Sequence, residues 1–222
     1  DYSRYLYFYL ENALRDKNFD ISNEISLNID SLSGSLLVSQ VNKWIQESQY
    51  SKFGKYFSCQ NETDLLGEFF FLIANLYSSQ DVFEKSNFYL KISNFLNPKF
   101  YFNLTLLAEN YYINENYEIA QSVLEKLDNE EEIYNWYKIK KIGQIISKQQ
   151  NNKKSLDCIE REFNKIYNPS PKILFDMANI YKSFKKYDKA IKLYSKVMQS
   201  VEKDTSIYAD LLYKRGGSYE RL

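Results

Sequence analysis

Small and apolar residues recur along this chain with a period near 34 residues. In five places a small residue is followed three positions later by an aromatic or aliphatic one: Ala74/Tyr77, Ala108/Tyr111, Gly143/Ile146, Ala178/Tyr181 and Gly216/Tyr219. Successive small residues are 34, 35, 35 and 38 positions apart. A repeat of this length is typical of stacked helical hairpins, each made of two amphipathic helices. We therefore expect an all-α protein built from repeated hairpins.

A second small residue follows twelve positions after each of the first four, at Ser86, Ala120, Ser155 and Ala190. Small side chains at both places let the two helices of a hairpin approach to the short end of the usual ~8–10 Å interaxial range. An aromatic residue stands at the predicted turn of three hairpins, as Phe83, Tyr117 and Tyr187, and Asn152 replaces it in the other. Each repeat is predicted to be two amphipathic helices joined by a short polar turn.

This spacing and these residue types resemble the tetratricopeptide repeat (TPR), in its bacterial form. The best match covers residues 171–201, at the positions Leu174, Met177, Ala178, Tyr181, Tyr187, Ala190, Tyr194 and Val197. Good copies surround Ala74 and Ala108, whereas the copy around Gly143 is degenerate, since Asn152 and Glu162 depart from the pattern. The resemblance implies a right-handed superhelical array, an α-solenoid, of about six TPR-like hairpins.

The first third of the chain carries a weaker form of the repeat. Phe19 and Tyr50 continue the turn aromatics backwards from the first clear repeat, at intervals of 31 and 33 residues. Phe53 stands where a small residue is expected, so its hairpin is predicted to splay or shift. We therefore expect degenerate N-terminal hairpins over residues 1–65 and a more regular array over 66–222 that ends within a repeat. This pattern also predicts that the chain is a fragment of a longer protein.

Residues that start and end helices agree with these boundaries. Ser170-Pro171 supplies an N-cap and a proline at the first helical position. The acidic run at 130–132 is expected to be a solvated partner of the next helix dipole. The lysine pairs at 153–154 and 185–186 are expected in turns. The glycine doublet at 216–217 is predicted to be a close-packing site within a helix.

Composition removes several classes of function. The 29 acidic and 29 basic residues give a formal net charge of zero, so no global field favours nucleic acid. The sequence has no histidine, and Cys59 and Cys158 are solitary, with neither metal-binding nor redox spacing. We therefore predict a protein that is not an enzyme and that has no cofactor and no metal site.

No apolar stretch approaches the ~18–20 residues that span a membrane, so we predict no membrane insertion. We expect a soluble protein, but the sequence does not distinguish the bacterial cytoplasm from the periplasm. It leaves the oligomeric state open as well.

In the TPR family the first helix of each hairpin lines a concave groove, at fixed offsets from the small residue. The groove residues that this resemblance implies are Phe71, Asn75, Thr105, Glu109, Tyr112, Tyr137, Lys140, Gln144, Phe175, Asn179, Lys182 and Tyr213. Amides can hydrogen-bond a peptide backbone while aromatic rings cover its side chains. The family's two-carboxylate clamp is not favoured, because Phe71 and Phe175 stand where that clamp needs lysine.

These observations favour a non-catalytic protein–protein interaction scaffold that binds a peptide or protein segment in the concave groove. Two alternatives stay open: the N-terminal repeat region of an enzyme, for example a glycosyltransferase, and an envelope-assembly adaptor. The aromatic strip can also be explained as packing against other segments of the same protein. Because the repeat is degenerate there, residues 148–154 are expected to exchange amide hydrogens faster than residues 171–201.

Overall fold

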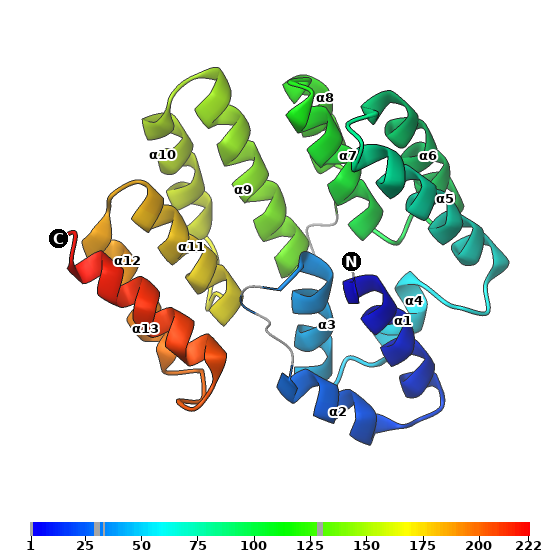
Figure 1. Ribbon diagram of the computed structural model, residues 1–222, viewed down its shortest axis with the longest axis horizontal. Helices are drawn as coiled ribbons and strands as arrows, with labels where there is room; N and C mark the ends of the chain where they lie inside the picture. The colour runs from blue at the N-terminus through cyan, green and yellow to red at the C-terminus, as the bar shows by residue number, and fades with distance from the viewer. Residues whose placement is uncertain (1, 29–31, 33, 128–130) are drawn as a thin grey trace. The chain divides into compact units, whose positions relative to one another are not determined.

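The computed structural model describes residues 2–28, 32, 34–127 and 131–222, and within these ranges every regular element is an α-helix (Figure 1). The helices are α1 (Tyr2–Arg15), α2 (Phe19–Asn28), α3 (Leu36–Gln46), α4 (Ser51–Tyr56), α5 (Glu62–Ser78), α6 (Phe83–Leu96), α7 (Phe102–Ile113), α8 (Tyr117–Leu124), α9 (Glu132–Gln149), α10 (Asn152–Phe163), α11 (Pro171–Ser183), α12 (Tyr187–Met198) and α13 (Ser206–Tyr219). The expected all-α fold is confirmed.

The chain forms two compact units. Unit 1 comprises Asp1–Ile29 and Ser35–Ile145, and unit 2 comprises Asp30–Gly34 and Ile146–Leu222. Consecutive helices pack as pairs in each unit, for example α5 with α6 and α7 with α8 in unit 1, and α11 with α12 in unit 2. Unit 1 therefore holds both the irregular first four helices and two of the regular hairpins.

One turn geometry recurs between the paired helices. A non-glycine residue with φ between 55° and 59° stands two positions before each of the predicted turn aromatics Phe19, Tyr50, Phe83, Tyr117 and Tyr187. The next amide donates to the carbonyl oxygen five residues back, over 2.7–3.0 Å, as from Val82 to Tyr77. These bonds are those of a Schellman motif, which satisfies the last carbonyls of a helix. The predicted turn positions are confirmed.

The connection from α9 to α10 has a different local geometry. Asn152 begins α10, and the side chain of Asn151 accepts a hydrogen bond from the Lys154 amide over 2.8 Å as an N-cap. Lys153 and Lys154 therefore lie in the first turn of α10, and the prediction that they lie in the turn between helices is wrong. At this place an asparagine cap precedes Asn152, where the other turns carry an aromatic residue.

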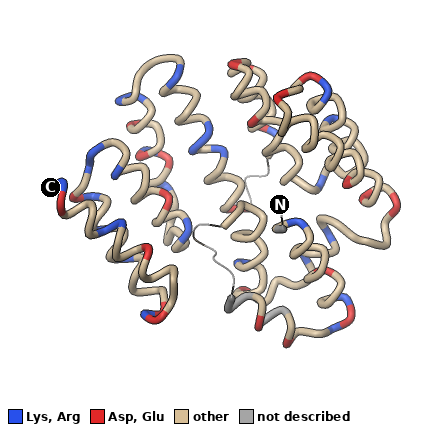
Figure 2. The backbone as a smooth tube through the Cα atoms, viewed as in Figure 1, with Lys and Arg blue, Asp and Glu red and all other residues tan. Residues whose placement is uncertain are grey.

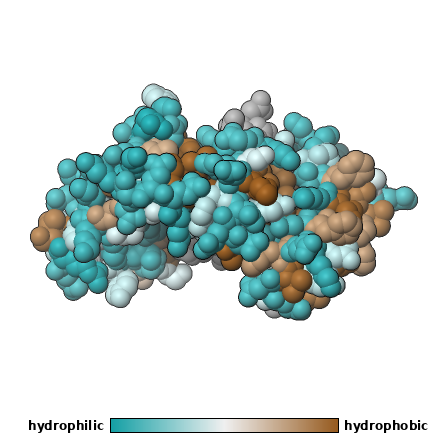
Figure 3. Space-filling model, turned by 90° about the horizontal axis from the view of Figure 1, so that it is seen from above, coloured by the Kyte–Doolittle hydropathy of each residue, from teal (hydrophilic) through white to brown (hydrophobic). Residues whose placement is uncertain are grey.

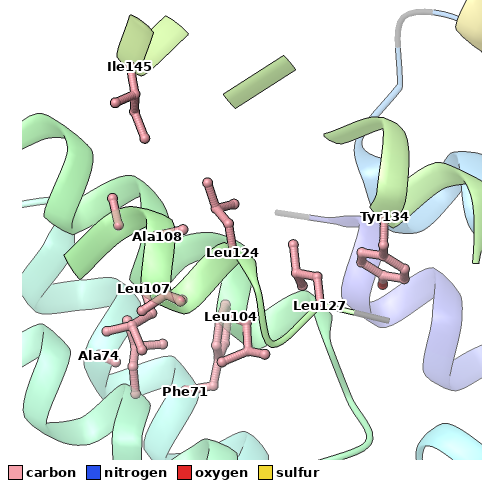
Figure 4. Close-up of a cluster of buried hydrophobic side chains, with 12 residues drawn as sticks. Phe71, Ala74, Leu104, Leu107, Ala108, Leu124, Leu127, Tyr134 and Ile145 are labelled. Atoms are coloured by element: carbon pink, nitrogen blue, oxygen red, sulfur yellow. The ribbon is translucent and has the colours of Figure 1, made fainter. Parts of the chain in front are cut away.

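The predicted small residues lie at the helix crossings. Ala74, Ser86, Ala108 and Ala120 are fully buried, within or beside a core formed by α5–α9 (Figure 4). Gly216 is an exception, because a Cβ atom at this position would meet nothing within 4 Å, so its predicted role in close packing is wrong. Sequence reasoning missed Gly67, whose added Cβ would lie 3.3 Å from the Ser93 carbonyl oxygen.

Aromatic side chains form the core of α1, α3 and α4. Tyr7, Trp44, Phe53 and Phe57 are each at most 2% exposed, and the Tyr7 and Phe53 rings stack with centroids 5.5 Å apart. The Tyr7 hydroxyl also donates to the Phe53 carbonyl oxygen over 2.7 Å. Helix α4 has only six residues. The bulky Phe53 thus sits in a short helix that packs on α1.

Acidic and basic residues are interspersed along the helices (Figure 2). Among the described residues, no helix combines the length and the apolar character that crossing a membrane requires.

Candidate functional site

A pocket of about 270 Å³ opens in unit 1, where side chains of five helices converge. Its lining consists of Arg4 and Tyr5 from α1, Leu36 from α3, Glu68, Phe71, Leu72 and Asn75 from α5, Phe102, Thr105, Leu106 and Glu109 from α7, and Tyr137 from α9. Rings and leucines make most of this surface. The pocket is thus concave and largely apolar, with a few polar groups among its walls.

Five of the residues predicted for the groove line this pocket together: Phe71, Asn75, Thr105, Glu109 and Tyr137. They come from the first helices of three successive hairpins, so the repeat brings them to one place. The pocket residues of α1 and α3 were not predicted. The one signal for Arg4 in the sequence is that it is the single charged residue at positions 2–10, where every other residue except Ser3 is aromatic or aliphatic.

Arg4 is a buried cation at one wall of the pocket, 4% exposed. Its guanidinium forms an ion pair with Glu68, in which Nε donates to Oε1 over 2.8 Å, and Nη1 donates to the Asn103 side-chain oxygen over 3.1 Å. Its Cζ lies 3.6 Å from the centroid of the Phe71 ring, a cation–π contact. Arg4 therefore ties α1 to α5 and α7 and is itself neutralised by Glu68.

Tyr137 and Glu109 belong to another part of the pocket lining. The Tyr137 hydroxyl donates to the Thr105 carbonyl oxygen over 3.2 Å, and Lys141 Nζ lies 2.5 Å from Glu109 Oε2. Burial and the nearby Glu109 carboxylate raise the pKa of Tyr137. Tyr137 therefore stays a neutral hydrogen-bond donor. The carboxylates of Glu68 and Glu109 both already have cationic partners.

Three predicted groove residues of unit 1 lie outside the pocket lining. The Tyr112 ring contacts Lys141, whose Nζ is 4.5 Å from the ring centroid. Burial raises the pKa of Tyr112, with smaller contributions from Tyr117 and Glu109. Gln144 is exposed and Lys140 is half-buried.

The four predicted residues of unit 2 are arranged within that unit. Phe175 is 4% exposed and packs on Tyr194, and the Tyr194 hydroxyl donates to the Asn179 side-chain oxygen over 2.7 Å. Lys182 Nζ lies 3.4 Å from the Lys214 carbonyl oxygen, and its pKa is lowered by burial and by nearby basic groups. Tyr213 is 79% exposed. Phe175 and Asn179 thus serve the packing of their own hairpin.

Glu131 forms a second buried polar centre, and the expectation that it is a solvated dipole partner is wrong. Its Oε1 accepts from Lys52 Nζ over 2.7 Å and from the Tyr56 hydroxyl over 3.1 Å. Its Oε2 accepts from Gln40 over 2.8 Å and from the Trp44 indole over 3.4 Å. Burial would raise the pKa of Glu131, but these donors outweigh it and the pKa is lowered. Glu130, in the same acidic run, lies outside the described residues.

The described residues contain no group of three histidine, cysteine, aspartate or glutamate side chains that could hold a metal ion. Burial and the neighbouring Glu11 carboxylate raise the pKa of the Cys59 thiol, which disfavours the nucleophilic thiolate. The pocket offers a concave shape, apolar surface and one side-chain amide, that of Asn75.

No family model matches this chain, and no curated protein matches its sequence.

Proposed function

We propose that this chain is a TPR-like interaction scaffold, a right-handed array of helical hairpins that binds a peptide or protein segment without catalysis. The observation that supports this proposal is the convergence of Phe71, Asn75, Thr105, Glu109 and Tyr137 on one pocket of unit 1. In this proposal, the repeat presents equivalent positions of α5, α7 and α9 to a single ligand.

The chemistry of the walls selects the part of the ligand that enters. Phe71, Phe102, Leu72 and Leu106 supply apolar surface, and the charges of Glu68 and Glu109 are already paired. A free charge on the ligand would lose its hydration there without a new partner. We therefore propose that one large apolar side chain, such as leucine, methionine or phenylalanine, fills the pocket.

The pocket rim carries groups suited to the backbone of the same segment. Asn75 is exposed beside the pocket, and Tyr5 of α1 is 63% exposed. An amide can donate to and accept from a peptide backbone, while a tyrosine ring covers a side chain at low entropy cost. The ligand is thus a short segment with an apolar anchor, held by its backbone at the rim.

Selection from a displayed random peptide library on the complete chain tests this proposal. We expect the enriched peptides to share one large apolar residue. Their affinity should fall about tenfold or more in Asn75→Trp, which places a bulky ring at the pocket mouth.

Gln144→Trp is the matched control, because Gln144 is exposed but does not line the pocket. Enriched peptides that bind both variants equally would contradict the proposal, and so would a selection that enriches no apolar anchor.

A further inference from the structure

The outward face of α5 is a stripe of exposed apolar residues. Leu65, Phe69, Leu72 and Leu76 follow one another at spacings of four, three and four, and their exposed fractions are 46%, 56%, 45% and 60%. This spacing places all four on one side of the helix. None of the four is charged, so the stripe is continuous and apolar.

Positions equivalent to those of the stripe are covered on α7, α11 and α13. On α7, Asn103 and Asn110 correspond to Phe69 and Leu76, and both donate to side chains of α6, for example Asn110 to Ser86 over 2.8 Å. On α11 and α13 the residues that correspond to Phe69 are Ile173 and Leu211, which are fully buried. The face of α5 is thus a stacking surface that stays exposed among the described residues of unit 1.

The apolar surface continues onto α6. Ring contacts lead from Phe69 to Phe70 at 5.7 Å, from Phe70 to Tyr89 at 6.1 Å and from Tyr89 to Phe88 at 5.3 Å between centroids. Phe95, one heptad after Phe88, is 83% exposed. Hydrophobic side chains gather at the right-hand end of Figure 3, where Figure 1 places α5 and α6.

The patch is large for a monomer. Taking roughly 200 Å² for a phenylalanine side chain, the exposed fractions of 56%, 60% and 83% at Phe69, Phe88 and Phe95 leave about 400 Å² of ring surface open. The leucines of α5, each about half exposed, take the patch above the ~300–600 Å² that is usual for the largest patch on a monomer. Two such patches together bury about the 1,200 Å² of a specific interface.

We propose that a second copy of this chain covers the stripe, with the two α5 helices antiparallel across a two-fold axis. A four-three-four apolar spacing interlocks with itself in the manner of coiled-coil packing, and a two-fold interface uses the same surface on both copies. Residues 69 and 72 then lie nearest the axis, and Leu65 of one copy faces Leu76 of the other.

Charged residues lie near both ends of α5. Glu62 is exposed at the N-terminal end of α5. Lys85 of α6 lies near the other end of α5, because its Nζ is 5.4 Å from the centroid of the Tyr77 ring. Antiparallel helices bring Glu62 of one copy towards Lys85 of the other, which lies beside the exposed Asp81 and Glu84, whereas parallel helices would bring two acidic N-termini together.

The oligomeric state of the complete chain tests the proposal. We expect light scattering during size exclusion to give twice the chain mass of 26.5 kDa. The double variant Phe69→Glu/Leu76→Glu should have the mass of one chain, because a dimer of this variant would bury like charges across the axis. Neither residue lines the pocket, although Leu72, which lies between them on the stripe, does.

Ile113→Glu is the matched control, because Ile113 is 56% exposed on α7 and lies outside the stripe; it should remain a dimer. A dissociation constant of about 100 µM is weak for a specific dimer. A wild-type chain that stays monomeric up to this concentration would overturn the proposal and would mean that another protein covers the stripe. A charged double variant that stays dimeric would overturn it too.

Cross-linking tests the antiparallel register. In a background of Cys59→Ser and Cys158→Ser, Leu65→Cys and Leu76→Cys chains are prepared separately, mixed and oxidised. We expect disulfide-linked dimers only in the mixture, since these two positions face each other across the axis. Efficient linkage of either variant with itself would overturn the antiparallel arrangement.

Discussion

Helices α5–α8 and helices α1–α4 of unit 1 share a turn geometry, but residues of different size pack them. In both regions a residue with φ between 55° and 59° ends the first helix of a pair. At the helix crossings, α5 and α7 carry Ala74 and Ala108. The corresponding positions of α1, α3 and α4 hold Leu10, Val41 and Phe53. Both regions thus share the turn geometry, whereas α1, α3 and α4 lack the small crossing residues of α5 and α7.

This difference shows that turn and stacking depend on separate residues. The turn needs one residue in the left-handed conformation and a few bonds to carbonyls within five positions, so it forms from local sequence. Close stacking needs small side chains where two helices cross. With Leu10 and Phe53 at those places, α1 and α4 instead form an aromatic core with Tyr7 and Trp44.

The polar groups that hold the two regions differ as well. Asn110 joins α7 to α6 through neutral amide and hydroxyl bonds, with Ser86 and Asn87 as partners. The first helices are joined to the rest of unit 1 by the buried charges of Arg4 and Glu131. Loss of one member of a buried charge pair is much more costly than loss of a neutral bond.

The largest predicted effect follows from removing Glu131. Glu131→Ala leaves Lys52, Gln40, Trp44 and Tyr56 without their shared acceptor, and we expect the free energy of unfolding of unit 1 to fall by about 4 kcal/mol. Urea unfolding followed by tryptophan fluorescence measures this change.

Glu132→Ala is the control for Glu131→Ala. Glu132 pairs with Lys43 over 2.6 Å, but both side chains are about a quarter exposed, so we expect less than about 1 kcal/mol. Equal losses in the two variants would show that Glu131 is not a structural centre.

Exchanging large and small residues tests the comparison at the helix crossings. Leu10→Ala should lower the free energy of unfolding by about 3 kcal/mol, because it leaves a cavity in the aromatic core. Ala108→Leu should lower it by about 2 kcal/mol, because the added atoms force α7 away from its neighbours. Urea unfolding of each variant measures both changes. A neutral Ala108→Leu would mean that close approach is not required.

Acid should act through Glu131. Its folded-state pKa is lowered, so its contribution is fully present above the unfolded value near 4.3 and is lost as the pH falls through the folded value. Burial raises the pKa of Asp64, so Asp64 changes the pH dependence of stability in the opposite direction. It does so equally in the wild type and in a variant of Glu131.

The difference in unfolding free energy between wild type and Glu131→Gln isolates the titration of Glu131. We expect this difference to be largest at pH 7 and to be smaller at pH 3. Urea titrations at the two pH values measure it. A difference that does not change with pH would contradict the lowered pKa.

The smallest predicted effect concerns two glycines. Gly216→Ala should stabilise α13 by up to about 1 kcal/mol, because alanine favours helix and its Cβ meets nothing. Gly67→Ala gains the same propensity but brings Cβ to 3.3 Å from the Ser93 carbonyl oxygen, so we expect no gain or a loss. Amide hydrogen exchange in α5 and α13 compares them. An equal gain at both sites would remove the packing role of Gly67.

The sequence predicted the features that depend on neighbouring residues. The turn aromatics and the buried Ala74 and Ala108 follow from spacings within one or two repeats. Arg4 and Glu131 could not be predicted in the same way, because Arg4 meets Glu68 across 64 positions and Glu131 meets Gln40 across 91. A charged residue on a helix is usually solvated, so its burial depends on helices that the local pattern does not place.

The candidate site was predictable to the same extent. The positions on α5, α7 and α9 follow from the repeat, whereas Tyr5 and Leu36 reach the pocket only because α1 and α3 pack against that array. Phe175 and Asn179 satisfy the same offsets but contact Tyr194 of their own unit. Offsets from the small residue therefore identify a face of a helix, but not what packs against that face or binds to it.

The most direct test of the central claim, that this pocket binds the ligand, is amide hydrogen exchange of the complete chain with and without a peptide from the display selection. We predict slower exchange in α1, α5 and α7, whose residues line the pocket, and unchanged exchange in α11–α13. Protection confined to α11–α13, or a bound peptide that protects none of α1, α5 and α7, would contradict the account.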